Sequence, residues 1–319
     1  MERLPDWLDP KLIEQGARLE RNDYANKVPF GIRGGFIPTF MNKYSALPMV
    51  LTGALSHNSS ARRVKETATF FTSMVMPDVL DRHSGAFKSA AMVRLMHSMV
   101  RFNLLHGDKW DIKVYGIPIP QIDQLPAGLL SAGRLALDVV RHGRTAFTRT
   151  ERARVELGRY RCFLLGLPKE LLPDTPQGIA DLLLIRHATL RKGYDDNCGA
   201  LVRATMAADF TLEHTLAGRI HAWMERGFAK VNFVPKFLRA GNHSQTTDAI
   251  RIGLGDYVGA ALAVIQIWVT TTIYGIASHI PIVNATADRS LVRRLTKLLG
   301  QYGHAEFKTN ASEYRAAHA

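Results

Sequence analysis

The side chains best suited to chemistry lie on one short stretch of sequence, where His97 stands between Arg94 and Arg101. Residues at i, i+3 and i+7 share one face of an α-helix, so these three side chains would form a single polar stripe. Most other residues between 92 and 102 are apolar. Such a helix is typically buried, and two buried guanidinium groups without partners would be very costly. The stripe is therefore expected to meet a partner inside the protein.

Haem b is one partner that suits this stripe. Its iron binds a neutral imidazole nitrogen, and its two propionates are bound by Arg, Lys or hydroxyl donors. The alternative is a core histidine with satisfied hydrogen bonds, flanked by arginines that pair with acids elsewhere in the chain. The spacing of Arg94, His97 and Arg101 on its own favours that alternative.

A second polar stripe is predicted on the preceding helix. Arg63 and Thr67 are four residues apart and would share a face, with Arg62, Lys65 and Glu66 nearby. Arg63 could bind a carboxylate through two hydrogen bonds, and Thr67 could donate another beside it. An ordinary amphipathic helix with a charged outer face explains the same residues and, without further information, is the favoured explanation.

Together these residues resemble a known family, which contains the bacterial latex-clearing protein (a rubber oxygenase) and the MpaB-type oxygenases. Its members carry four elements in a fixed order: Arg-x-x-x-Thr, then Val-Arg-x-x-His-x-x-x-Arg, then Gly-x-Pro-x-x-Gln-x-Asp, then Leu-Leu-Gly before Glu-Leu-Leu-Pro. This chain matches them at residues 63–67, 93–101, 116–123 and 164–173. The resemblance covers the region from about residue 45 to residue 180. The C-terminal third is similar only in length and helical character.

The resemblance implies a globin-like helical core that encloses a b-type haem, with His97 as the proximal iron ligand. Arg63 and Thr67 correspond to residues that line the haem pocket near its distal side and the propionates. Arg94 and Arg101 correspond to residues around the proximal helix, where they would bind propionates or brace the helix. These five residues are the expected cofactor-binding set, and His97 is the expected metal ligand.

One position departs from the family pattern. In latex-clearing proteins a lysine directly precedes the threonine and can occupy the distal iron position, whereas this chain has Glu66 there. Lys65 is one residue earlier, about 100° away around a helix, so it should not replace that lysine. The distal site is expected to be open, water-bound or lined by Glu66, which could act as a general base. A surface ion pair with Arg62 or Arg63 explains Glu66 equally well. Arg63, Glu66 and Thr67 are thus the candidate catalytic residues.

The resemblance does not imply that rubber is the substrate. The polymer-cleaving relatives are secreted, whereas residues 1–6 have neither the basic start nor the apolar run of a signal peptide, so we expect a cytoplasmic protein. We expect a haem-dependent, dioxygenase-like enzyme that uses dioxygen on a hydrophobic molecule, such as an isoprenoid or a natural-product intermediate. Two alternatives stay open. One is another haem-dependent reaction (peroxidation, desaturation or rearrangement) on the same fold, and the other is a non-catalytic helical protein that binds lipid or membrane.

Composition and short motifs exclude several other classes of protein. With 319 residues, 46% of them hydrophobic, the chain can bury a large core. Its net charge of +13 favours anionic partners, but no nucleic-acid-binding motif accompanies the scattered basic clusters, so we expect no nucleic acid. Cys162 and Cys198 have no metal-ligand spacing and fit a reducing compartment. No HExxH motif, 2-His-1-carboxylate spacing or GxSxG elbow is present.

The elements that must position these residues are almost all helical. Alternation with period two is nearly absent, apart from a short strand-like run at 112–115, so an all-α fold is predicted. Residues 1–45 are rich in Pro and Gly and are expected to form an irregular N-terminal arm, with one short helix at 10–21 and a flexible connector at 31–35. Residues 46–319 would form one helical haem-binding domain. Its expected helices span about 59–76, 85–106, 121–142, 149–165, 176–191, 197–225, 244–275 and 287–302.

The segment 258–277 needs its own interpretation, because it is nearly free of charge and long enough to cross a bilayer. Gln266, the threonines at 270–272 and the glycines Gly259 and Gly275 argue against a membrane span. A helix that is apolar on all sides is also typical of the centre of a large helical domain. We therefore expect a buried core helix, and contact with a membrane surface stays open.

Overall fold

The computed structural model describes residues 4–40, 43–52, 60–190, 195–235 and 250–303. These described residues form helices and turns and contain no β-strand, which confirms the all-α prediction.

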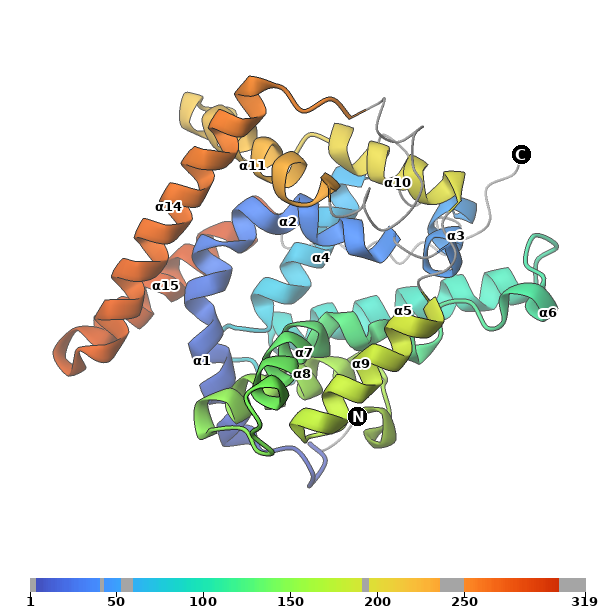
Figure 1. The fold of residues 1–319 in the computed structure, drawn as a ribbon, viewed down its shortest axis with the longest axis horizontal. Helices are drawn as coiled ribbons and strands as arrows, with labels where there is room; N and C mark the ends of the chain where they lie inside the picture. Colours follow the sequence, from blue (N-terminus) through green and yellow to red (C-terminus); the bar gives the residue numbers. More distant parts are fainter. Residues whose placement is uncertain (1–3, 41–42, 53–59, 191–194, 236–249, 304–319) are drawn as a thin grey trace. The chain divides into compact units, whose positions relative to one another are not determined.

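Figure 1 shows the described helices in chain order, coloured from blue to red. They are α1 (Pro10–Asn26), α2 (Val28–Phe36), α3 (Lys43–Leu51), α4 (Ser60–Ser73), α5 (Gly85–Leu105), α6 (Ile112–Tyr115), α7 (Leu125–Arg141), α8 (Arg149–Leu164), α9 (Pro176–Leu190), α10 (Asp196–Ala207), α11 (Leu216–Asn232), α14 (Leu254–His279) and α15 (Pro281–Gln301). Three short 3-10 helices accompany them: η1 (Ile37–Phe40), η2 (Gln121–Gln124) and η3 (Lys169–Leu171).

The chain divides into two compact units, each built from three segments. The first unit comprises Met1–Arg21, Phe70–Met99 and Ile119–Arg191, and the second comprises Asn22–Thr69, Val100–Pro118 and Lys192–Ala319. The helices α1, α4 and α5 each begin in one unit and end in the other. The expected single domain over residues 46–319 stays a prediction.

The core of the first unit lies between α7, α8 and α9. Leucines at 125, 129, 167 and 172 pack there with Ile179 and Val155. The helices α7 and α8 approach closely at Gly128 and Gly158, where a Cβ on Gly128 would collide with the Gly158 carbonyl oxygen. Only glycine permits this approach. On another side of α8, Gly16 of α1 lies similarly close to Ala153, so α8 is buried on nearly every side instead of carrying one apolar stripe.

The core of the second unit gathers side chains from η1, α3, α10 and α11. Its fully or nearly fully buried members include Phe40, Ala46, Val202, Ala229 and Val234. The helix α2 packs on α11, and α11 packs in turn on α14.

The N-terminal region is helical, so the irregular arm predicted for residues 1–45 is wrong for the described part of that region. The helix α1 continues to Asn26, well beyond the expected end at residue 21. The supposed flexible connector at 31–35 lies within α2, whose buried residues include Phe30 and Arg33. The glycines were read as breakers, but Gly34 lies so close to the Phe233 ring that a Cβ would collide with it.

Two further predictions differ from the structure. The strand-like run at 112–115 forms the single helical turn α6, because the Asp111 side chain accepts a hydrogen bond from the Lys113 backbone N–H and caps the turn. The helix expected over 197–225 is two helices, α10 and α11, and the second begins at the Thr215 N-cap.

The expected core helix around residues 258–277 corresponds to α14, and the expectation that it is buried is wrong. Among the described helices, α14 is the one long and apolar enough to cross a membrane. Only 11% of its most apolar window is buried.

The N-terminus of α8 offers a test of local stability. Thr148 and Glu151 form a reciprocal capping box, and Arg144 donates two hydrogen bonds to the Glu151 carboxylate. The Arg144 hydrogen bonds, together with the bonds from Thr148, lower the pKa of Glu151 to about 2. We expect Thr148→Ala to lower the free energy of unfolding by about 0.5–2 kcal/mol in urea titrations, because the cap is lost.

Because the pKa of Glu151 is lowered, the stability that this cap contributes should depend on pH. A carboxyl group with a lowered pKa stabilises the fold above its usual value of 4.5, and this stabilisation is lost as the pH falls towards 2. Glu151→Gln should therefore be less stable than the parent chain at neutral pH, and the gap should close in acid. The exposed Glu14→Gln is the control and should follow the parent at every pH. A gap for Glu151→Gln that does not change with pH would contradict this account.

Candidate functional site

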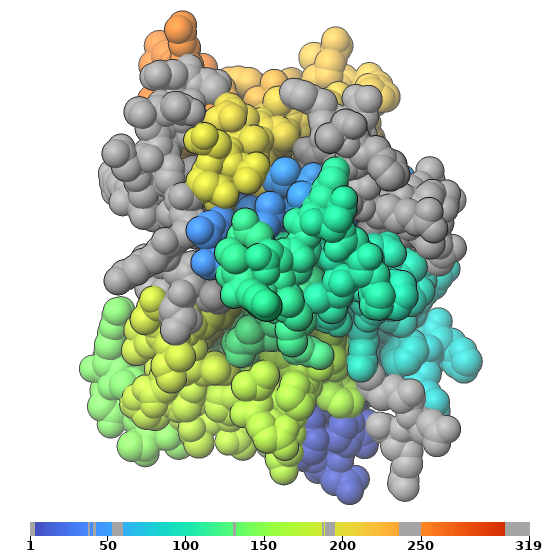
Figure 2. All heavy atoms as spheres, turned by 90° about the vertical axis from the view of Figure 1, so that its right-hand side faces the viewer, coloured from blue at the N-terminus to red at the C-terminus, as the bar shows by residue number. Residues whose placement is uncertain are grey.

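Arg94, His97 and Arg101 lie at i, i+3 and i+7 of the continuous helix α5. The His97 and Arg101 side chains are half-buried, and Arg94 is exposed. The helix is not buried all round as predicted, because Leu95 is 45% exposed and Phe102 is 60% exposed. Figure 2 shows the C-terminal part of α5 and α6, coloured green, at the surface. The helix thus buries one face and leaves apolar side chains open beside His97.

Arg94 lies against Gly166, and both belong to the first unit. Gly166 has a φ of +98°, which residues with a side chain rarely adopt. A Cβ on Gly166 would lie 3.2 Å from Nε of Arg94. Two of the four sequence elements, one on α5 and the other after α8, therefore meet at this point.

Arg101 connects α5 to a third element within the second unit. Its Nε donates a hydrogen bond to the Pro118 carbonyl oxygen at 3.1 Å. Nearby, the Trp110 indole N–H donates to the Gly116 carbonyl oxygen at 2.8 Å. The Arg101–Pro118 hydrogen bond thus links α5 to the third sequence element, and the role of Arg101 stays a prediction.

The first element, on α4, contains a buried ion pair. Nη1 of Arg63 donates to Oε2 of Glu66 at 2.9 Å, and Nε of Arg62 lies 3.5 Å from Oε1 of Glu66. Arg63 is 9% exposed and Glu66 is 3% exposed. The stretch is therefore not a solvated outer face, and Glu66 pairs with both arginines at a buried position. Thr67, half-buried, follows Arg63 by one turn.

The predicted site residues are divided between the two units. Arg94 and His97 belong to the first, whereas Arg63, Glu66, Thr67 and Arg101 belong to the second. Arg63 and Glu66 form an ion pair on α4. Arg94, His97 and Arg101 share the helix α5.

The chemistry of these donors is compatible with haem. His97 is the sole histidine of α5, and a haem iron takes one imidazole from its proximal helix. Guanidinium and hydroxyl groups are the usual propionate donors. Within the described ranges, no three His, Cys, Asp or Glu side chains come together to hold a metal ion.

A buried cluster that the sequence analysis missed lies in the second unit. Arg33 is fully buried, and its guanidinium binds the Glu225 carboxylate and the carbonyl oxygens of Thr205, Met206 and Ala208. Burial lowers the pKa of Arg33 and raises the pKa of Glu225, because leaving water disfavours both charged forms. A signal was available: Phe30, Arg33, Gly34 and Ile37 follow the helical period.

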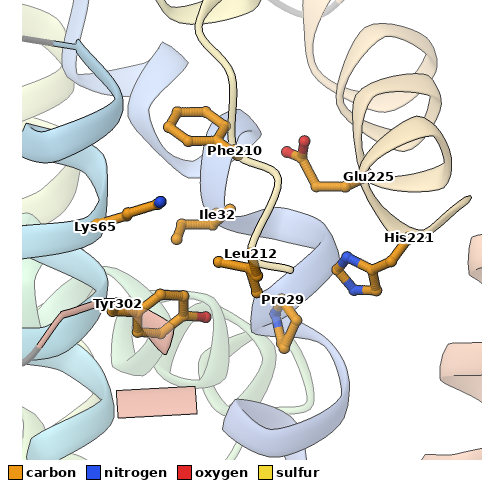
Figure 3. Close-up of a pocket in the computed structure, with 8 residues that line it drawn as sticks. All are labelled: Pro29, Ile32, Lys65, Phe210, Leu212, His221, Glu225 and Tyr302. Carbon is orange, nitrogen blue, oxygen red and sulfur yellow. The ribbon is translucent and has the colours of Figure 1, made fainter. Parts of the chain in front are cut away.

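This ion pair borders a small pocket. Figure 3 shows Lys65 and Tyr302 on one side of the pocket, with His221 and Glu225, both from α11, on the other. Burial lowers the pKa of His221. Lys65 therefore lies in the wall of this pocket, whereas its neighbour Glu66 pairs with Arg62 and Arg63.

A larger cavity of about 540 Å³ lies in the same unit. It is lined by parts of α1, α2, α11, α14 and α15 and contains both apolar side chains, such as Met224 and Leu298, and the cationic Arg294 and Lys297. Glu213 also lines it and pairs with Lys297 at 3.0 Å, so the lining suits a largely apolar molecule.

Comparisons with known proteins point to the same family as the four sequence elements. The family model described as "ER-bound oxygenase mpaB/B'/Rubber oxygenase, catalytic domain" matches residues 24–255. Among solved structures, the chain resembles one titled "Structure of Latex Clearing Protein LCP in the closed state", with 17% sequence identity and a TM-score of 0.54. The likeness covers 93% of this chain and 76% of the other, and at this identity it concerns the fold alone. No curated protein matches the chain.

The contact between Arg94 and Gly166 gives a testable prediction. Gly166→Ala should lower the free energy of unfolding by more than about 1 kcal/mol, because the positive φ and the adjacent guanidinium both oppose a side chain. Gly143→Ala is the matched control, since Gly143 has a φ of +69° but open space around it. Urea titrations should show the larger loss for Gly166→Ala, and equal losses would mean that the Arg94 contact contributes nothing.

Proposed function

Because this chain belongs to the family of MpaB-type and rubber oxygenases, we propose that it is a haem b-dependent oxygenase with His97 as the proximal iron ligand. The family model covers residues 24–255 of 319 and supports an oxygenase-type enzyme. The observation that carries the more specific proposal is the half-buried His97 on α5, with an arginine on each side that contacts another of the family's sequence elements.

The residues around His97 have a positioning role in this proposal. Arg101 is hydrogen-bonded to the Pro118 carbonyl, and Arg94 lies against Gly166, so both restrict how α5 can turn. A metal-binding imidazole needs such support, because its direction sets the ligand geometry. Bound haem supplies the redox and dioxygen chemistry that protein side chains lack.

The buried pair on α4 supplies charge and a proton acceptor. Arg63 holds the Glu66 carboxylate at 2.9 Å, and Arg62 approaches it from the other side. We assign Glu66 the role of general base, with Arg63 as the group that positions it and Thr67 as a hydrogen-bond donor on the same helix. In this proposal the Glu66 carboxylate stands at the sequence position where latex-clearing proteins have a lysine.

The substrate in this proposal is a hydrophobic molecule, such as an isoprenoid or a natural-product intermediate, and dioxygen is the co-substrate. Two things support it. The family includes rubber oxygenases, named for a hydrophobic polymer, and the second unit contains a cavity of about 540 Å³ with substantial apolar lining.

The role of His97 can be tested by absorption spectroscopy. The parent chain, purified after expression with added haem precursor, should show a Soret band, and His97→Ala should lose it because the iron loses its protein ligand. His106→Ala is the matched control, since His106 is exposed just beyond the same helix. A haem spectrum in His97→Ala that matches the parent would contradict the assignment of His97 as the iron ligand.

The role of Glu66 requires a separate readout. Glu66→Gln keeps the size of the side chain but removes the charge, so we expect turnover to fall by about 10²–10⁴-fold while the Soret band persists. Turnover is measured as ¹⁸O incorporated from labelled dioxygen into an alkene substrate. Glu14→Gln, at an exposed position, should behave as the parent.

Two outcomes would count against this assignment. Undiminished turnover in Glu66→Gln would remove the general base from the proposal. Product without ¹⁸O from the parent enzyme would indicate a different haem-dependent reaction.

A further inference from the structure

The helix α14 and the turn into α15 expose a continuous apolar surface. Six residues at helical spacing form a stripe along α14: Val258, Leu262, Ile265, Val269, Ile273 and Ile276. Their exposed fractions run from 39% to 60%. Trp268 is 68% exposed beside this stripe, and Ile282 in the first turn of α15 is 92% exposed. Soluble proteins rarely leave a contiguous apolar surface of this kind uncovered.

The opposite face of α14 is held by protein. Gly227 of α11 lies so close to α14 that a Cβ would be 2.6 Å from the Asp256 carbonyl oxygen, and a Cβ on Gly259 would lie 3.3 Å from Trp223. In the second half of α14, the Asn22 amide donates to the Thr271 carbonyl oxygen at 2.9 Å. A helix with one packed face and one apolar face suits the surface of a membrane better than a span through it.

Three hydroxyl groups of α14 are hydrogen-bonded within the helix. The Thr270 hydroxyl donates to the Gln266 carbonyl oxygen at 2.7 Å, and the Thr271 hydroxyl donates to the Ile267 carbonyl oxygen at 2.6 Å. Ser278 donates to the Gly275 carbonyl oxygen at 2.7 Å. Hydroxyls bonded in this way can enter an apolar medium at little cost, because they leave no group unsatisfied.

The charged residues of α15 are mostly basic, with Asp288 as the one acid, beside Arg289. No Asp, Glu, Lys or Arg occurs from residue 257 to residue 287. Asp256, at the start of α14, pairs with Lys230 at 2.9 Å. On α15, the exposed Arg289 and Arg293 follow Ile282 by seven and eleven residues, or about 10 and 16 Å along the helix.

We propose that the α14 stripe and the α14–α15 turn form a docking surface for an anionic lipid bilayer. The stripe and Ile282 enter the boundary between headgroups and acyl chains, and Arg289 and Arg293 bind lipid phosphates. A second copy of the chain fits less well, because a two-fold pairing of this surface would bring its arginines close together with few acids to offset them. The proposal is independent of haem and of the reaction catalysed.

Sedimentation with vesicles tests this surface on the full chain. One set of vesicles is phosphatidylcholine alone, and the other is phosphatidylcholine mixed with phosphatidylserine. The parent should bind the anionic set more tightly, and added salt should weaken binding. The double variant Ile276→Glu/Ile282→Glu should weaken binding at least about tenfold, since it removes two inserted apolar side chains.

Two further variants distinguish docking through this surface from nonspecific binding to vesicles. Ile112→Glu/Val114→Glu changes two exposed apolar residues of α6, which are 53% and 60% exposed, and should leave vesicle binding unchanged. Arg289→Gln/Arg293→Gln should reduce binding to the anionic vesicles only. Trp268 fluorescence should shift to the blue on binding, and Trp268→Phe should lose that shift.

Several results would overturn the proposal. They are an absence of parent binding to either set of vesicles, equal losses for the α6 and α14–α15 variants, and concentration-dependent dimers that Ile276→Glu/Ile282→Glu converts to monomers. The last result would assign the surface to self-association.

Discussion

Buried guanidinium groups constrain this structure more than any other feature. Five arginines are less than 10% exposed: Arg21 donates to the Val75 carbonyl oxygen, and the other four each contact a carboxylate at 2.7–3.0 Å. The pairs are Arg33–Glu225, Arg63–Glu66, Arg159–Glu156 and Arg161–Glu20. Breaking a buried pair by removing one partner typically costs about 3–5 kcal/mol. Two of the pairs join different helices within one unit: Arg33–Glu225 links α2 to α11 in the second unit, and Arg161–Glu20 links α8 to α1 in the first.

The same constraint shapes the candidate site. On α4 Arg63 pairs with Glu66, and Arg62 approaches the same carboxylate, so this buried acid is fixed between two guanidinium groups. On α5 the arginines are held differently: Arg101 donates to a backbone carbonyl, and Arg94 lies beside a glycine with positive φ. The sequence elements that identify the family are thus the ones that hold α5 in place.

Much of the helical fold could be predicted from periodicity, because most helices are long and some of their ends are marked by caps such as Thr148. The predictions were wrong where the same residue type occurs in two different structural settings. Gly34 suggested a flexible connector, but it allows Phe233 to approach a buried helix. The apolar run at 258–277 suggested a core helix, since composition cannot tell burial in protein from exposure to lipid. The Arg33–Glu225 pair spans 192 residues, a contact that local patterns cannot indicate. The cytoplasmic location stays a prediction.

The central claim is that α5 presents His97 to a haem iron, and the absorption spectrum of the purified full-length chain tests it most directly. After expression with added haem precursor, the account predicts a red protein with a Soret band and close to one haem per chain by pyridine haemochrome assay. A colourless protein that also fails to take up added haem in titration would contradict it.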